Sequence, residues 1–123
     1  MSVAEIANGL VALCREGKNL DAVNKYYADD IVSVESASGP NMPAETKGIE
    51  AIRGKHHWWY ENHEIHGEEV NGPFVGDGQF AVEFKMDVTH KPSGKRFQMS
   101  EMALYTVRNG KIAHEHFYYN AGA

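Results

Sequence analysis

The sequence predicts an α+β domain in which a curved antiparallel sheet, with one short strand and four long ones, wraps over three N-terminal helices. Two observations carry this prediction. Residues 79–119 contain three runs that alternate apolar and polar side chains, the two-residue period of a strand with one buried face. Most of residues 1–63 instead space their apolar side chains as a helix does, so these helices are expected to cover the apolar face of the sheet.

Turn signals join the strands of this C-terminal half. Asp77-Gly78 precedes the first of the three runs, and the segment Lys91–Lys95, which contains a proline and a glycine, precedes the second. Asn109-Gly110 precedes the last run, and this pair can hold both positive-φ positions of a tight hairpin turn. The expected inward face of the first two runs consists of Phe80, Val82, Phe84, Met86, Val88, Phe97, Met99, Ala103, Tyr105 and Val107.

Two helices are expected at the N-terminus. Ser2 and Glu5 have the capping-box spacing that satisfies two backbone donors at a helix start, and Gly17 is a suitable stop. Cys14 lies on the apolar stripe of this first helix and is expected to be a small core residue. The second helix is expected to begin near Asn19 and to end around Asp29-Asp30.

Residues 31–75 are predicted to contain a short strand, a loop, a third helix and a long strand. Residues 31–35 are predicted to form the short strand, and Ser36–Lys47, with Gly39, Pro40 and Pro43, to form a long surface loop of the kind that often borders a site. Thr46 is a candidate cap for a third helix. Glu64–Val75 is then the first long strand, and Gly72-Pro73 within it predicts an edge position or a bulge. Helices and sheet would enclose a cone-shaped cavity.

Composition narrows the classes of function. A chain of 123 residues with 24% charged and 42% hydrophobic residues is expected to be a single globular domain over residues 1–123. The net charge of −5 without a basic cluster argues against nucleic acid or an anionic membrane as partner. The apolar runs are too short for a membrane span, no signal pattern opens the chain, and one cysteine suits a reducing compartment, so we expect a cytoplasmic protein.

Several strings resemble those of the SnoaL-like family, within the superfamily of nuclear transport factor 2 and ketosteroid isomerase. These strings are Leu20-Asp21, Tyr27-Ala28-Asp29-Asp30, Gly48–Ile52 and Asn109–Ile112. The resemblance covers nearly the whole chain and implies the cystatin-like α+β fold. The fold serves isomerases, polyketide cyclases, dehydratases and binding modules, so function must be argued from the site.

The resemblance implies one catalytic position. In isomerase-type members a general base ends the short strand, and this position falls on Glu35. The two donors that hold the enolate in the isomerase do not carry over, because their positions fall on Leu10 and Ala103, although Glu101 lies on the same strand face. The acid/base aspartate of the cyclases corresponds most nearly to Asn120.

A second carboxylate could complete an acid/base pair. Alignment of the last strand with the family turns Glu115, Phe117 and Tyr119 towards the cavity and the histidines at 114 and 116 outwards. If Glu35 and Glu115 lie close together, their pKa values would separate, as an acid/base pair requires. The alternative for Glu115 is a salt bridge with a lysine or arginine.

The histidine-rich stretch from His56 to His66 raises the question of a metal. His63 and His66 are one residue short of the helical zinc motif, and they span a helix end and a strand start, so their rings need not converge. We therefore expect no metal. We also expect no cofactor, because the chain has no phosphate-cradling glycine loop and no dinucleotide fingerprint.

Two hypotheses of different classes follow. The first is an enzyme that moves protons on a small, largely apolar organic molecule by isomerisation, cyclisation or dehydration, with Glu35 as base and Glu115, His66 or Tyr119 as acid or orienting group. The second is a non-catalytic ligand-binding domain or dimeric scaffold. The convex sheet face, with Met102, Leu104 and Tyr118, predicts a homodimer. Expected ligand contacts are His56, Trp59, His63, His66, Phe84, Glu101 and Tyr119.

Overall fold

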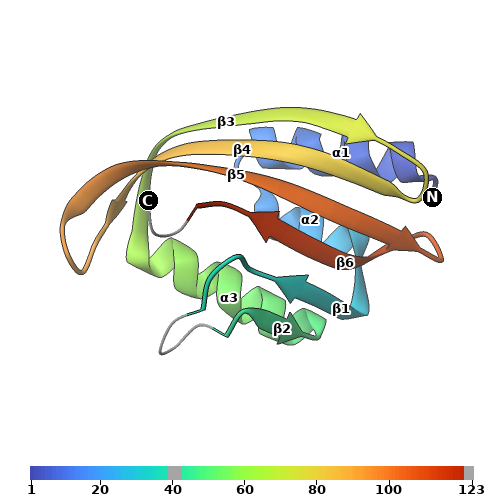
Figure 1. The fold of residues 1–123 in the computed structure, drawn as a ribbon, viewed down its shortest axis with the longest axis horizontal. Helices are drawn as coiled ribbons and strands as arrows, with labels where there is room; N and C mark the ends of the chain where they lie inside the picture. Colours follow the sequence, from blue (N-terminus) through green and yellow to red (C-terminus); the bar gives the residue numbers. More distant parts are fainter. Residues whose placement is uncertain (39–42, 121–123) are drawn as a thin grey trace.

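The computed structural model describes residues 1–38 and 43–120. Three helices and six strands follow one another within these residues: α1 (Val3–Arg15), α2 (Asn19–Tyr26), β1 (Tyr27–Val34), β2 (Glu45–Lys47), α3 (Ile49–Asn62), β3 (His63–Val75), β4 (Gln79–His90), β5 (Lys95–Arg108) and β6 (Lys111–Tyr118). The strands form one sheet in the order β2-β1-β6-β5-β4-β3 (Figure 1). The predicted α+β class is confirmed.

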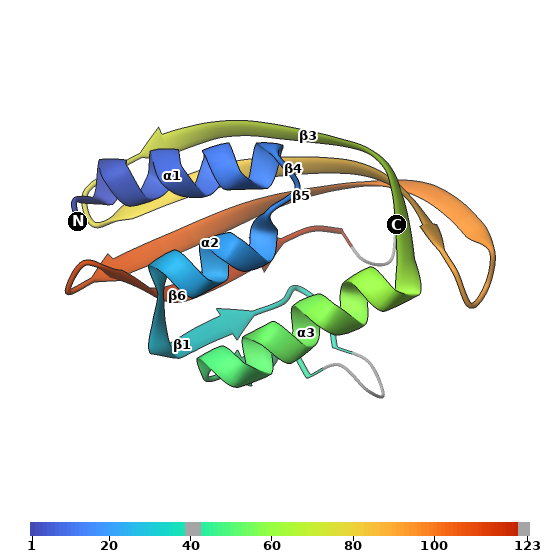
Figure 2. The same ribbon diagram turned by 180° about the vertical axis from the view of Figure 1, so that it is seen from behind.

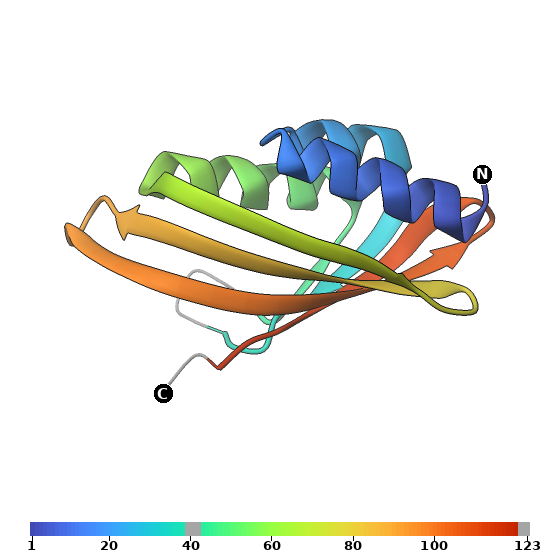
Figure 3. The same cartoon turned by 90° about the horizontal axis from the view of Figure 1, so that it is seen from above.

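All three helices lie on one side of the curved sheet (Figure 3). Helix α1 packs against β3 and α2, whereas α3 packs against β1 (Figure 2). The core between helices and sheet forms because each α1 turn places an apolar side chain inwards, as the helical spacing predicts. Its fully buried members include Ile6, Leu10, Ile52, Phe80, Val82 and Ile112. None of the described helices is long and apolar enough to cross a membrane.

The local signals at turns and caps are confirmed. Ser2 and Glu5 form the capping box of α1, each side chain bonding to the other's backbone N–H. Asn109 and Gly110 have φ angles of 53° and 74°, so the β5–β6 turn uses both positive-φ positions. The register of β3 on β4 shifts between Asn71 and Phe74, which places a bulge at Pro73 on an edge strand.

The predicted sheet was wrong in two respects. Residues 45–47, expected in the long loop, form the edge strand β2 on β1; residues 39–42 of that loop, with Gly39 and Pro40, lie outside the described residues. The sheet is mixed, because β1 pairs with β6 in parallel. Periodicity identifies a strand but not its neighbour, and here the helix-containing segment between β1 and the hairpins lets the first and last strands run side by side.

Two helix boundaries also differ from the expected ones. Helix α2 ends at Tyr26 rather than at Asp29-Asp30, because Tyr27 is already extended and pairs with Ile112 of β6. Helix α3 begins after Gly48, with no side-chain cap, since Thr46 is paired with Ser33 in the sheet and is not available as the cap. The earlier start of β1 matters for the site, because it points Tyr27 into the interior.

Candidate functional site

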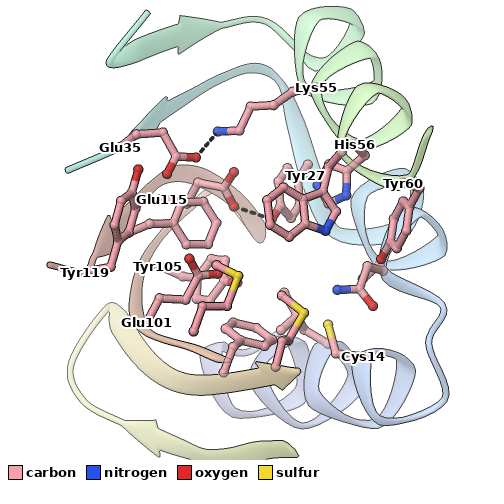
Figure 4. A pocket seen from close by; sticks show the side chains of 18 of the residues that line it. Cys14, Tyr27, Glu35, Lys55, His56, Tyr60, Glu101, Tyr105, Glu115 and Tyr119 are labelled. Carbon is pink, nitrogen blue, oxygen red and sulfur yellow. Dashed lines mark hydrogen bonds and ion pairs between the residues drawn. The ribbon is translucent and has the colours of Figure 1, made fainter. Parts of the chain in front are cut away.

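A cavity of about 240 Å³ lies between the sheet and the helices, and its wall is mostly apolar (Figure 4). Every helix and four of the strands, or the residues that directly follow them, contribute to it. The lining residues are Leu10, Cys14, Asn19, Ala22, Tyr27, Glu35, Lys55, His56, Trp58, Trp59, Tyr60, Phe84, Met86, Met99, Glu101, Tyr105, Glu115, Phe117 and Tyr119. Three of them are glutamates, an unusual number for an apolar cavity, since each buried carboxylate needs a partner or a proton.

Glu35 is one half of an ion pair inside the cavity. It follows directly on β1, and its backbone N–H is held by the carbonyl of Ala44. The Lys55 ammonium of α3 lies 2.5 Å from the Glu35 carboxylate, and their side chains are only 23% and 10% exposed. The same ammonium donates to Ser33 Oγ at 3.0 Å and lies 5.3 Å from the centre of the Phe117 ring. Lys55 thus supplies the positive charge that a carboxylate at this place requires.

Glu115 is the most deeply buried of the three glutamates, with 1% of its surface exposed. Its carboxylate accepts a hydrogen bond from the Tyr27 hydroxyl (Figure 4). It also stands opposite Ser33 in the parallel β1–β6 pairing. Burial raises the pKa of Glu115, while the Tyr27 hydroxyl and the Lys55 charge oppose the rise. Glu115 is therefore held by protein groups on its own side of the cavity.

Glu101 differs from the other two glutamates because no hydrogen bond or ion pair within the described residues involves it. It projects from β5 into the cavity, two residues before the buried Ala103 on the same strand face. Burial, followed by the negative charges of Glu35 and Glu115, raises the pKa of Glu101 to about 7. Glu101 consequently exchanges its proton near neutral pH, whereas Glu35 has a cationic partner.

Three other groups of the cavity, on His56, Tyr119 and Cys14, each keep a single protonation state at neutral pH. Burial, with a smaller effect from the neighbouring Lys55 charge, lowers the pKa of His56 to about 4, so its imidazole is neutral. Burial and the nearby Glu35 raise the pKa of Tyr119 to about 12. Burial likewise raises the pKa of the Cys14 thiol to about 12, which makes it unreactive, as expected of a core cysteine.

The structure brings most of the predicted site residues together. Glu35, Glu115, His56, Trp59, Phe84, Glu101 and Tyr119 all line the cavity. The outward placement of the last strand's histidines also agrees with the structure, in which His116 stacks on the exposed Tyr118 at 4.1 Å.

His63 and His66 are not among the cavity residues, contrary to the prediction. His63 is 7% exposed, stacks on Trp59 with ring centres 3.7 Å apart, and is hydrogen-bonded through Nδ1 to the Trp59 carbonyl. His66 is exposed and bonds through Nε2 to Thr89 Oγ1 on the neighbouring strand. Both histidines lie where α3 passes into β3, so a helical period does not determine which side they face.

Sequence reasoning missed two groups that complete the site. Lys55 follows Ile52 by three residues on the inner face of α3, a spacing that could have placed it near the cavity. Tyr27 had been assigned to a helix, and the alternation of Ile31 and Ser33 does not extend back to it, because Asp29 is exposed and the pairing of β1 with β6 shifts register between Tyr27 and Val32. Within residues 1–38 and 43–120, no three His, Cys, Asp or Glu side chains are grouped so as to hold a metal ion.

Comparison with known proteins places the chain in a family. A model described as the SnoaL-like domain matches residues 1–119. The chain belongs to the SnoaL-like family. A solved structure from Mesorhizobium loti is 52% identical. That protein is provisionally assigned as a SnoaL-like polyketide cyclase and also described as a carbohydrate phosphatase. The match covers 97% of this chain and 100% of that one, with a TM-score of 0.92. No curated protein matches the chain.

More distant solved structures share the fold. A provisionally assigned SnoaL-like polyketide cyclase from Jannaschia is 14% identical, with a TM-score of 0.73, over 95% of this chain and 84% of that one. A protein with a ketosteroid isomerase-like fold from Catenulispora acidiphila, solved with trimethylamine, is 21% identical, with a TM-score of 0.73. That match covers 98% of this chain and 88% of the other. At 14% and 21% identity these likenesses show the fold alone, so function must be argued from the cavity residues.

Proposed function

We propose that this SnoaL-like protein binds a small, largely apolar organic molecule in the cavity and transfers a proton on it, as an isomerase, cyclase or dehydratase does. The observation that carries the proposal is the contrast between two carboxyl groups that line one cavity. Glu35 is paired with the Lys55 ammonium, whereas Glu101 has no such partner and a pKa of about 7. Two titratable groups in opposed environments are the arrangement that acid–base catalysis uses.

Glu35 is the proposed base. It removes a proton from the carbon beside a substrate carbonyl, a step that isomerisation and cyclisation share. Glu101 in its protonated form is the proposed acid, which donates to the carbonyl oxygen as the enolate develops. This role would replace the enolate donors that are absent at Leu10 and Ala103. The apolar wall strengthens both interactions because it excludes water.

Glu115 has a supporting role in this proposal. Its carboxylate accepts from Tyr27, and its charge faces the Lys55 ammonium from the floor of the cavity. A group that is 1% exposed and already hydrogen-bonded is poorly placed to exchange protons with a substrate. We therefore assign to Glu101 the acid role that the sequence had suggested for Glu115.

The charge of the cavity disfavours phosphatase activity. Three glutamates line it, and the ammonium of Lys55 is already engaged by Glu35 and Ser33. A phosphate group would therefore meet repulsion from the carboxylates and find no unpaired cation among the described residues that line the cavity. A neutral carbonyl compound fits the same charges better.

The test is catalysed exchange of a proton beside a carbonyl. 2-Tetralone, a bicyclic ketone, is incubated in D2O with the protein, and loss of its exchangeable proton signals is followed by NMR. We expect exchange above the buffer rate, with a decrease of about 10² for Glu35→Gln. Glu101→Gln should also slow it, and Glu61→Gln, at an exposed position of α3, should leave it unchanged.

The competing hypothesis is a ligand-binding domain without catalysis. It predicts that 2-tetralone binds, as measured by calorimetry, yet exchanges no faster than in buffer. Binding without exchange would thus favour that hypothesis, and the absence of both binding and exchange would overturn the choice of ligand class. A cytoplasmic location is part of the proposal, as expected from the composition.

A further inference from the structure

Ser33 is a fully buried polar residue beside the site, and the proposed proton transfer gives it no role. It lies on β1, its exposed fraction is 0%, and it shares an inward strand face with the fully buried Ile31. A buried hydroxyl group costs free energy unless it is hydrogen-bonded. The partners of Ser33 are therefore informative, and they are two charged groups of the site.

The first partner is the Lys55 ammonium of α3, which donates to Ser33 Oγ at 3.0 Å. The same ammonium lies 2.5 Å from the Glu35 carboxylate and 5.3 Å from the centre of the Phe117 ring. Lysine has a flexible four-carbon stem and three N–H donors, so several groups are needed to keep its ammonium in one place. Among the described residues, Ser33 is the hydrogen-bond acceptor that Lys55 has besides Glu35.

The second partner is Glu115 on β6. The parallel pairing of β1 with β6 places Ser33 directly opposite Glu115. Burial raises the pKa of Glu115, and hydrogen bonds from Tyr27 and Ser33, together with the Lys55 charge, oppose that rise. A serine hydroxyl can accept one hydrogen bond while it donates its hydrogen to another group. Ser33 thus accepts from the ammonium and donates to the carboxylate.

We propose that Ser33 is a positioning residue whose hydroxyl holds the Lys55 ammonium against the Glu35 carboxylate. Ser33 is suited to this task because the sheet pairing fixes its backbone and Glu115 orients its hydroxyl. Two carboxylates then share one lysine, Glu35 directly and Glu115 through Ser33. The inference rests on the proposed function only for the role of Glu35 as base.

The first experiment follows the Glu115 carboxyl group of the full chain by carbon-detected NMR. Ser33→Ala removes a donor from the charged form, so we expect the Glu115 titration to move to higher pH. Ser33→Thr keeps the hydroxyl and should restore the native titration, while Ser100→Ala, at an exposed position of β5, should not change it. An unchanged Glu115 titration in Ser33→Ala overturns the inference. The other titratable groups around Glu115 are the same in all four proteins: Cys14, Tyr27, Glu35, Lys55, Glu101 and Tyr105.

A double-mutant cycle tests the contact between Ser33 and Lys55. Urea denaturation gives the stability lost in Ser33→Ala, in Lys55→Met and in the double variant. Without Lys55 the hydroxyl has no ammonium to hold, so the loss in the double variant should be smaller than the sum of the single losses. Ser100→Ala and Lys55→Met should be additive. Additive losses for Ser33→Ala and Lys55→Met would overturn the inference.

Proton exchange on 2-tetralone separates positioning from a purely structural role. The ketone cannot reach Ser33, which is 0% exposed. In Ser33→Ala we therefore expect the maximum exchange rate to fall about tenfold and the KM to change by less than about twofold. Ser33→Thr should recover most of the rate. The alanine measurements decide the inference even if the extra methyl group of threonine prevents folding.

These measurements distinguish the inference from the proposed function. If the native protein catalyses no exchange, the proposed function is refuted, while the NMR titration and the cycle still decide whether Ser33 holds Lys55. If the native protein catalyses exchange and Ser33→Ala keeps the full rate, the proposed function stands and the positioning role of Ser33 is overturned.

Discussion

The Lys55 ammonium lies 2.5 Å from the Glu35 carboxylate, so the residue at the family's base position is paired with a cation from α3. This pair links the first strand to a helix that sequence analysis had connected with the cavity only through aromatic and histidine side chains. Because the two side chains are largely shielded from solvent, removing either one would leave the other charge without a partner. The pair is thus a feature of both stability and function.

Replacement of Lys55 by methionine should destabilise the protein. The change keeps most of the side-chain length but leaves the Glu35 carboxylate without its cation, so we expect the free energy of unfolding to fall by about 2 kcal/mol. Urea denaturation at pH 7 measures the change. A second substitution, Glu35→Gln, should recover part of the loss, because it removes the unpaired charge.

Lys47→Met is the matched control for this prediction. Lys47 pairs with Glu45 at 3.5 Å, but both side chains are more than half exposed, so its loss should cost less than about 0.5 kcal/mol. Equal effects of the two lysine substitutions would contradict the view that the Lys55 pair differs from a surface pair.

Tyr27→Phe should weaken the protein in a pH-dependent way. The Tyr27 hydroxyl donates to the buried Glu115 and opposes the effect of burial on the pKa of that carboxyl group. Without the hydroxyl we expect the free energy of unfolding to fall by about 1–3 kcal/mol at pH 8, because the buried Glu115 carboxylate then has one hydrogen-bond donor fewer to replace the water it lost on folding. The loss should be smaller at pH 5, because a protonated carboxyl group needs the donor less.

Urea denaturation at the two pH values tests this prediction, with Tyr118→Phe as control. Tyr118 is 48% exposed, and no hydrogen bond to its hydroxyl occurs within the described residues. Its substitution should therefore change the free energy of unfolding by less than about 0.5 kcal/mol. If Tyr27→Phe had the same effect at both pH values, the Tyr27 hydroxyl would not be stabilising the charged form of Glu115, and the prediction would be contradicted.

The sequence predicted the elements of the fold better than their arrangement. Alternation on 79–119 and the capping box of α1 are local patterns, and the structure contains both. The parallel pairing of β1 with β6 joins segments about 80 residues apart, and no local pattern specifies it. The strand β2 is only three residues long, too short to show a period.

The same distinction applies to the candidate site. Glu101, Glu115 and Tyr119 could be placed in the cavity because strand alternation fixes the side that each one faces. His63 could not be placed reliably, because it sits where a helix passes into a strand and the period changes. The ion pair of Glu35 with Lys55 depends on how α3 packs against β1, which is a tertiary contact.

A homodimer through the outer sheet face remains our prediction. Met102 and Tyr118 are cross-strand partners on β5 and β6, 37% and 48% exposed, and His116 stacks on Tyr118. Such neighbouring apolar groups on the face opposite the helices would be covered in a dimer. Tyr118→Glu should therefore yield monomers at micromolar concentration in sedimentation velocity. Val75→Glu, at the exposed end of β3, should leave the dimer intact.

Two results would contradict this prediction. Light scattering that gives a single-chain mass at micromolar concentration would contradict it directly. A dimer that persists in the Tyr118→Glu variant would instead move the interface to another face.

Glu101→Gln should stabilise the protein above neutral pH and have little effect in acid. The unfolded chain releases the glutamate proton near pH 4.3, whereas the native state keeps it until about pH 7. Between these values the native state binds more protons, so the stability of the native protein falls as pH rises, and it stays lower above pH 7. Glutamine has no such charge to bury, so the variant avoids this loss.

The predicted difference is on the order of 3 kcal/mol at pH 8, declining towards zero near pH 4. Urea denaturation of both proteins across this range measures it, and the comparison of native protein with variant cancels the contributions of other titrating groups. Glu61→Gln, at an exposed position on α3, should follow the native curve throughout. If Glu101→Gln shifted stability equally at pH 4 and pH 8, the gain would come from packing. Glu101 would then lack the proton that the proposed acid must carry, and the proton-transfer proposal would lose one of its two groups.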